Sequence, residues 1–103
     1  MRMWLVDPKG MCNEHLLGEH AETHMLAGCL RLGRSIEGYL SGGLVEVHSL
    51  RGRHDELARE MVGRGMRHES PLPEFVERRL GSIDVEANKV ELAKRCERCR
   101  RRL

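Results

Sequence analysis

Three side chains near the start of the chain could do chemistry together. His15, Glu19 and Glu22 follow an i, i+4, i+7 pattern, so they line one face of a helix within two turns. It costs stability to place an imidazole and two carboxylates on a helix face that could have been apolar, unless these groups are solvated or have a function. The α-amino group of the chain lies close to them in sequence. An amine and a carboxylate held together are the two groups that imine chemistry on an aldehyde-like carbon requires.

The composition predicts one small helical domain. The 103 residues are enough for a single domain over residues 1–103, which buries only about 60–65% of its unfolded surface. Aromatic residues make up 3% of the chain, so the core must consist of Leu, Val, Met and Ala. Such a core suits packed helices better than a sandwich. We therefore predict an all-α fold, compact and built from about three main helices, with an extended N-terminal segment leading into the first.

Capping and turn residues predict where these helices begin and end. Asn13 is the expected N-cap of the first helix, which stops at Gly33. The predicted elements, in chain order, are a helix that follows the N-cap Asn13 and runs to about 32, a short helix over 34–40, an extended segment over 44–48, a helix over 50–64, a short helical piece over 74–80 and a helix over 85–101.

The net charge is only +2, but the basic residues are clustered. Arginines gather at positions 98 and 100–102, and again at 51, 53, 64 and 67. Arginine outnumbers lysine, which suits bidentate contacts with phosphate, although a solvated surface with a basic tail explains the same pattern. No apolar run approaches the ~18 residues of a membrane span, and no signal peptide is recognised. We therefore expect a cytoplasmic protein with no membrane partner.

The cysteines leave a metal site open as an alternative. Cys96 and Cys99 form a single CxxC pair, which alone is weak evidence for zinc. Cys12 and Cys29 lie near opposite ends of the first predicted helix, roughly 25 Å apart, so they cannot share one zinc ion. A zinc site would need one of those two cysteines plus a histidine. A Cys12–Cys96 or Cys29–Cys99 disulfide is not expected in a reducing cytosol.

Two histidines of the first predicted helix also have a spacing found in metal sites. His20 and His24 are an i, i+4 pair. The Glu that follows the first His in a metalloprotease helix is absent here, since Ala21 stands at that position. We interpret both histidines as ordinary polar residues, and we expect the protein to need no metal and no organic cofactor.

The sequence of residues 13–22, Asn-Glu-His-Leu-Leu-Gly-Glu-His-Ala-Glu, resembles the first helix of the phage pyrimidine-dimer DNA glycosylase/AP lyase family, known as endonuclease V. That family carries an acid or amide pair, then His-Leu, then a Glu and a second Glu three residues on. The spacing back to the N-terminus is also similar, with Arg2 where the family has an Arg and Met1 where it has its nucleophilic N-terminal residue. Further similar stretches are 43–48, 63–65 and 82–85 with the lysines after it.

The resemblance implies a role for each matched residue. The α-amine of Met1 is the expected nucleophile and Glu22 the expected catalytic carboxylate. The expected DNA contacts are Arg2, His15, Lys89 and Lys94. We expect Glu19 to be structural and to pair with a buried or partly buried cation, for which Arg2 is the candidate.

Some features of the family are missing from this chain. Ala21 and Met25 stand where the family has two arginines of its first helix, and the chain ends Arg102-Leu103 without the family's aromatic tail. These differences leave the amine and the carboxylate in place. Because these residues are missing, the resemblance does not define which damaged or modified base the protein removes.

The resemblance therefore predicts a DNA N-glycosylase with AP lyase activity. Its expected substrate is double-stranded DNA with a pyrimidine dimer or another damaged or modified pyrimidine. An α-amine has a reference pKa near 8, so a useful fraction is neutral and can attack C1′ to form an imine. Glu22 would stabilise the oxocarbenium-like transition state and promote β-elimination.

Two other classes of function remain as alternatives. One is a non-catalytic DNA-binding module of the same fold, and the other is a zinc-dependent nuclease or hydrolase built on the His and Cys residues. In each case we expect a monomer in the cytoplasm, associated with the nucleoid or encoded by a phage in its host cell.

Overall fold

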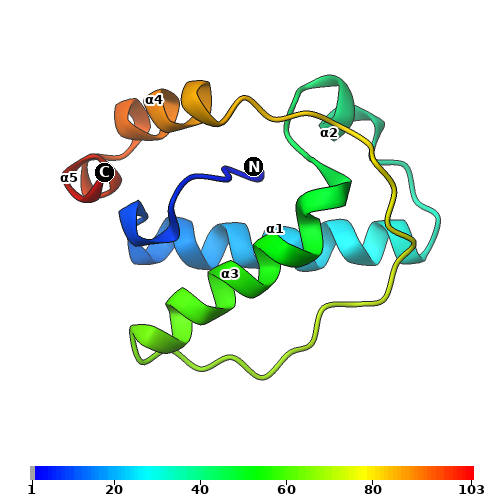
Figure 1. Cartoon of the computed structure of the whole chain (residues 1–103), viewed down its shortest axis with the longest axis horizontal. Helices are drawn as coiled ribbons and strands as arrows, with labels where there is room; N and C mark the ends of the chain where they lie inside the picture. Colours follow the sequence, from blue (N-terminus) through cyan, green and yellow to red (C-terminus); the bar gives the residue numbers. More distant parts are fainter. Residues whose placement is uncertain (1) are drawn as a thin grey trace.

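Residues 2–103 are described by a computed structural model, in which five α-helices and two short 3-10 helices enclose the N-terminal segment (Figure 1). The elements, in chain order, are η1 (Pro8–Gly10), α1 (Asn13–Arg31), α2 (Glu37–Ser41), η2 (Val47–Ser49), α3 (Leu50–Gly63), α4 (Val85–Arg95) and α5 (Glu97–Arg102). No strand occurs in the described part of the chain, and three of the helices are long, so the predicted all-α fold is confirmed. Within residues 2–103, no helix combines the length and the apolar character that crossing a membrane requires.

Helix α1, with 19 residues, is the longest helix, and α3 packs across it (Figure 1). The helix begins one residue earlier than predicted, since its N-cap is Cys12 rather than Asn13. Cys12 has the extended backbone of an N-cap, but its side chain makes no capping bond because the sulfur contacts other side chains instead. The helix ends before Gly33, which adopts φ 70°, a backbone conformation that glycine tolerates best.

The core consists of two clusters of buried side chains, both of which include residues of the N-terminal segment. Met3 belongs to the first cluster, and Trp4 and Val6 belong to the second. The first cluster comprises Met3, Leu26, Ala27, Ile36, Val45, Val47, Leu50, Leu72 and Ile83. The second comprises Trp4, Val6, Met11, Cys12, Leu16, Leu57, Met61, Leu92 and Cys99. Residues 3–6 are therefore held by both clusters, each of which also contains residues of α1.

The predicted helical piece over 74–80 does not form. At its end, the Leu80 carbonyl accepts a bond of 2.8 Å from the Val47 amide, and the Leu80 amide donates locally to the Arg78 carbonyl at 2.9 Å. Just beyond it, the Glu46 carboxylate accepts a bond of 3.0 Å from the Ile83 amide. Tertiary bonds therefore anchor the end of this segment in an extended path.

Two further predicted elements differ in the structure. Within residues 2–103, the segment over 44–48 is joined to the N-terminal segment by one backbone bond of 2.9 Å, from the Met3 amide to the Leu44 carbonyl. The chain then enters η2 without forming a strand. The helix predicted over 85–101 is broken at Cys96, whose backbone is extended (φ −134°, ψ 111°). The break produces α4 and α5, and the CxxC pair lies at their junction.

Candidate active site

An open cleft of about 350 Å³ lies among α1, the N-terminal segment and the end of α4. Its lining residues are Arg2, Trp4, Glu14, His15, Gly18, Glu19, Glu22 and Arg95. The face predicted from the spacing of His15, Glu19 and Glu22 is thus turned toward the cleft. Gly18 lies on the same face, and a Cβ there would meet no atom within 4 Å, so the absence of a side chain helps to keep the cleft open.

A residue of the neighbouring helix α2 orients the Glu22 carboxylate in the cleft. Its side chain is largely buried, with the residue only 4% exposed, yet it lines the cleft. The Tyr39 hydroxyl on α2 donates a bond of 2.6 Å to Glu22 Oε1. This bond, together with burial, raises the pKa of Tyr39 to about 12, so the hydroxyl keeps its proton and remains a donor at neutral pH.

Glu19 forms a buried ion pair with Arg53 of α3. The two bonds are 2.6 Å and 2.8 Å long, and the side chains are 0% and 2% exposed. Arg53 also donates to the Val6 carbonyl at 2.7 Å, so one guanidinium joins α3, α1 and the N-terminal segment. The expectation of a buried cation beside Glu19 is confirmed, but the expected partner, Arg2, is wrong.

Arg2 is engaged elsewhere in the cleft. Its guanidinium donates to Asn88 Oδ1 at 3.1 Å and lies 4.6 Å from the centre of the Trp4 ring. Arg95 lies 5.9 Å from the same ring, so two cations flank one indole at the cleft. Arg95 was not among the predicted site residues, although an i, i+4, i+7 pattern on α4 places it on the face that carries the buried Asn88 and Leu92.

The structure does not bring every predicted DNA contact to this cleft. Lys89 lines a separate cavity of about 310 Å³ with Lys9 and Arg102, and Lys94 is exposed on α4. Both remain predictions as phosphate contacts. The predicted nucleophile, Met1, lies outside the described residues. Arg2 and His15 share the cleft with Glu22.

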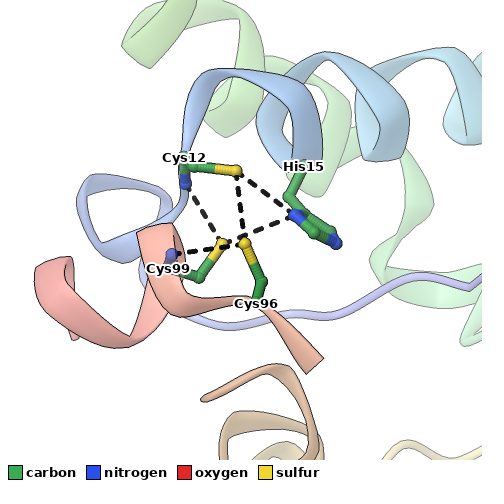
Figure 2. A group of neighbouring side chains, drawn as sticks. All are labelled: Cys12, His15, Cys96 and Cys99. Atoms are coloured by element: carbon green, nitrogen blue, oxygen red, sulfur yellow. Dashed lines mark hydrogen bonds between the residues drawn. The ribbon is translucent and has the colours of Figure 1, made fainter. Parts of the chain in front are cut away.

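Two groups of side chains could hold metal ions. The sequence offered Cys12 or Cys29 with an unidentified histidine as partners of the CxxC pair in the first group, but it did not assemble the second group. The first contains Cys12, His15, Cys96 and Cys99, and the second contains His20, His24, His54 and His68. In each group the potential ligand atoms all lie within 4.8 Å of one another. Figure 2 shows the first group, in which the CxxC pair meets the first turn of α1. The signals in the sequence were the CxxC pair of Cys96 and Cys99 and the i, i+4 pair of His20 and His24. The other ligands of each group lie far away in the sequence, so spacing alone could not identify them.

The protonation of these groups reflects their burial. Burial raises the pKa of Cys99 to about 12, so the thiol stays protonated at neutral pH when no cation is present. Burial and three neighbouring imidazoles lower the pKa of His20 to about 4. Its ring is therefore neutral at pH 7 and retains a nitrogen lone pair.

The family model for pyrimidine dimer DNA glycosylase matches residues 1–74. The matched region contains every residue that lines the cleft except Arg95. The chain therefore belongs to the pyrimidine dimer DNA glycosylase family, and DNA is the substrate that this family implies. No curated protein and no solved structure gives a significant match to the chain.

Proposed function

We propose that this protein removes a damaged or modified pyrimidine from double-stranded DNA and then cuts the strand through an imine intermediate. The observation that carries the proposal is the position of Glu22: a largely buried carboxylate, held by Tyr39, that lines an open cleft beside the N-terminal segment. Residues 1–74, which include Glu22, match the pyrimidine dimer DNA glycosylase family.

The first chemical step would be attack of the neutral α-amine of Met1 on C1′ of the nucleotide. The C1′–N bond breaks, and the base leaves with its electron pair and takes up a proton. The amine loses its protons as the sugar ring opens, and an imine remains between the chain and C1′. Negative charge on Glu22 would stabilise the positive charge that develops at C1′ before the base departs.

The second step would cut the strand by β-elimination. Glu22, or a water that it orients, takes a proton from C2′, and the electron pair expels the 3′ phosphate. Hydrolysis of the imine then releases the amine and the DNA end. Only one carboxylate is needed, and this agrees with the separate role of Glu19 in the ion pair with Arg53.

Two arginines and a tryptophan of the cleft have the charge and the apolar surface that binding DNA requires. Arg2 and Arg95 place two positive charges beside Trp4, where they could contact phosphates next to the extruded nucleotide. The indole offers an apolar surface between them. We assign these residues to binding the distorted duplex rather than to the chemistry.

Reduction with borohydride tests the proposal directly. Incubation with an abasic duplex and borohydride should give a covalent adduct, and peptide mapping should place it on Met1. A control with extra residues before Met1 should fold but give no adduct. An adduct on a lysine would overturn the α-amine mechanism, and DNA binding without incision or adduct would favour a non-catalytic module. Incision that proceeds without any adduct and is abolished by EDTA would favour a metal-dependent nuclease.

A further inference from the structure

Three cysteines and one histidine from opposite ends of the chain converge beside the first turn of α1. Cys12 and His15 belong to that turn, whereas Cys96 and Cys99 lie at the junction of α4 and α5 (Figure 2). Cys12 and Cys99 are buried, and all four cysteines of the chain are free thiols. Cys29 is the only cysteine of the described chain outside the group.

Three of the six distances between ligand atoms in this group are close to the edges of a zinc tetrahedron, and all six are within 4.8 Å. With Zn–S of about 2.3 Å and Zn–N of about 2.0–2.1 Å, the edges are about 3.8 Å between two sulfurs and about 3.5 Å between sulfur and nitrogen. The Sγ atoms of Cys12 and Cys96 are 3.8 Å apart. His15 Nδ1 lies 3.5 Å from Cys99 Sγ and 3.2 Å from Cys12 Sγ.

The backbone around the group supplies donors that suit thiolates. The Cys12 amide points to Cys99 Sγ at 3.2 Å, and the Cys99 amide points to Cys96 Sγ at 3.4 Å (Figure 2). Amide donors stabilise the negative charge that a sulfur carries as a metal ligand. The helix break makes Cys96 the N-cap of α5, so its sulfur accepts the bond from the Cys99 amide.

We infer that Cys12, His15, Cys96 and Cys99 bind a structural zinc ion that fastens the C-terminal helices to α1. The donor set is closed, with four protein ligands and no position for water, as in structural rather than catalytic sites. Two of the ligands lie beyond residue 74, where the family match ends, so the metal would secure a part of this chain that the family model does not cover.

The ion would also fix the orientation of His15. Its Nδ1 is turned to the thiols, and its second ring nitrogen points away from them (Figure 2). Since His15 also lines the cleft, metal at Nδ1 would leave Nε2 as a donor toward the DNA side. The zinc ion would thus position a DNA contact without entering the chemistry.

A second group, made only of histidines, points independently to another metal. His20 and His24 lie on α1, His54 on α3, and His68 in the segment that follows α3. Five of the six pairs of rings in this group have centroids 4.8–5.2 Å apart. The Nε2 atoms of His20 and His24 are buried, and neither has a hydrogen-bond partner within residues 2–103. Unpaired buried nitrogens of this kind are costly unless they bind something.

Two contacts show how such an ion would be held. The Nε2 atoms of His54 and His68 are 3.3 Å apart, and a zinc tetrahedron has an edge of about 3.3 Å between two nitrogens. The Asp55 carboxylate lies 2.9 Å from His54 Nδ1 and can only accept, so Nδ1 carries the proton and Nε2 keeps its lone pair. A carboxylate behind a ligating histidine is typical of metal sites. We propose that these four imidazoles bind a second divalent transition-metal ion, with zinc as the probe.

Metal analysis of untagged protein, refolded with excess zinc and then desalted, tests both sites. We expect two zinc ions per chain in the wild type and in the controls Cys29→Ser and His48→Gln, which change the cysteine and the histidine outside the two groups. The double variant Cys96→Ser/Cys99→Ser should retain one ion, and His54→Gln/His68→Gln should also retain one. A wild type without zinc would overturn both proposals, and two ions in either double variant would overturn the corresponding site.

Measurements on the wild type keep the test independent of how the variants fold. Cobalt(II) should give the intense visible bands of a tetrahedral site and a thiolate charge-transfer band, and zinc should displace both. With zinc bound, only Cys29 should react rapidly with a thiol reagent, and a chelator should expose the other three cysteines. A cobalt spectrum without the thiolate band, or a Cys12–Cys96 disulfide under reducing conditions, would overturn the first site. None of these measurements depends on glycosylase activity.

Discussion

Replacing Glu22 by Gln removes the charge at the centre of the candidate active site and changes little else. Glutamine is nearly isosteric, keeps the helix propensity of the position and retains a carbonyl oxygen that can accept the Tyr39 bond. The variant therefore separates the electrostatic role of Glu22 from its role in packing.

The magnitude of each effect can be worked from these contacts. A hydrogen bond to a charged group contributes roughly 1.5–3 kcal/mol and a neutral one about 1 kcal/mol, so Glu22→Gln should destabilise the fold by about 1 kcal/mol. In a domain of this size that lowers Tm by roughly 4–8 °C. The loss of one preorganised electrostatic group typically lowers a catalytic rate about 100- to 1000-fold. The rate should therefore fall far more than the stability.

Single-turnover incision is the appropriate assay. Duplexes with one cyclobutane pyrimidine dimer or one abasic site would measure base removal and strand cutting, and fluorescence anisotropy would measure binding. We expect Glu22→Gln to bind lesion DNA at least as well as the wild type, because a negative charge near the phosphates is gone. Tyr39→Phe, which removes the donor but keeps the carboxylate, should fall between the wild type and Glu22→Gln.

A near-normal rate of incision in Glu22→Gln would refute this reasoning. If Glu19→Gln lost incision in a folded protein at the same time, the two carboxylates would have to exchange roles. A parallel loss of binding and incision in Glu22→Gln would instead indicate that the residue supports the structure of the cleft.

Three further predictions follow from contacts around the site. Glu19→Gln removes the buried counter-charge of Arg53 and leaves it only the half-exposed carboxylate of Glu56 at 2.6 Å, so urea unfolding should show a loss near the lower end of roughly 3–5 kcal/mol, and a loss below about 1 kcal/mol would contradict the buried pair. Burial alone would raise the pKa of Glu46, but a hydroxyl and a backbone amide that donate to it outweigh burial and lower the pKa. Its stabilising contribution is therefore present above the ordinary value of 4.5 and is lost as the pH falls through the folded pKa, so Glu46→Gln should lower Tm at pH 7 by more than it does at acidic pH; a constant difference would exclude this role. Arg95→Ala should lower the slope of log Kd against log salt by about one unit, and an unchanged slope would remove Arg95 from the phosphate contacts.

Local patterns predicted the main helices and one face of the site. The spacing of His15, Glu19 and Glu22 depends only on the 3.6-residue period of a helix, so their common face could be derived before the fold was known. Gly33 and Gly65, both with positive φ in the structure, follow the first and second predicted long helices. The helical piece predicted over 74–80 does not form, and its last carbonyl, that of Leu80, bonds instead to the distant Val47 amide.

The sequence by itself determined the helical class, the positions of the first two long helices, the start of the third and the carboxylate face of α1, because helix period and capping act over a few residues. Only the tertiary structure decided which cation meets Glu19, which hydroxyl orients Glu22 and which residues complete the two groups of metal-binding side chains. Arg53 is 34 positions from Glu19, and Cys96 is 84 positions from Cys12. Such pairs meet only when helices pack, and packing depends on the shape and charge of whole surfaces rather than on the spacing of residues along one helix.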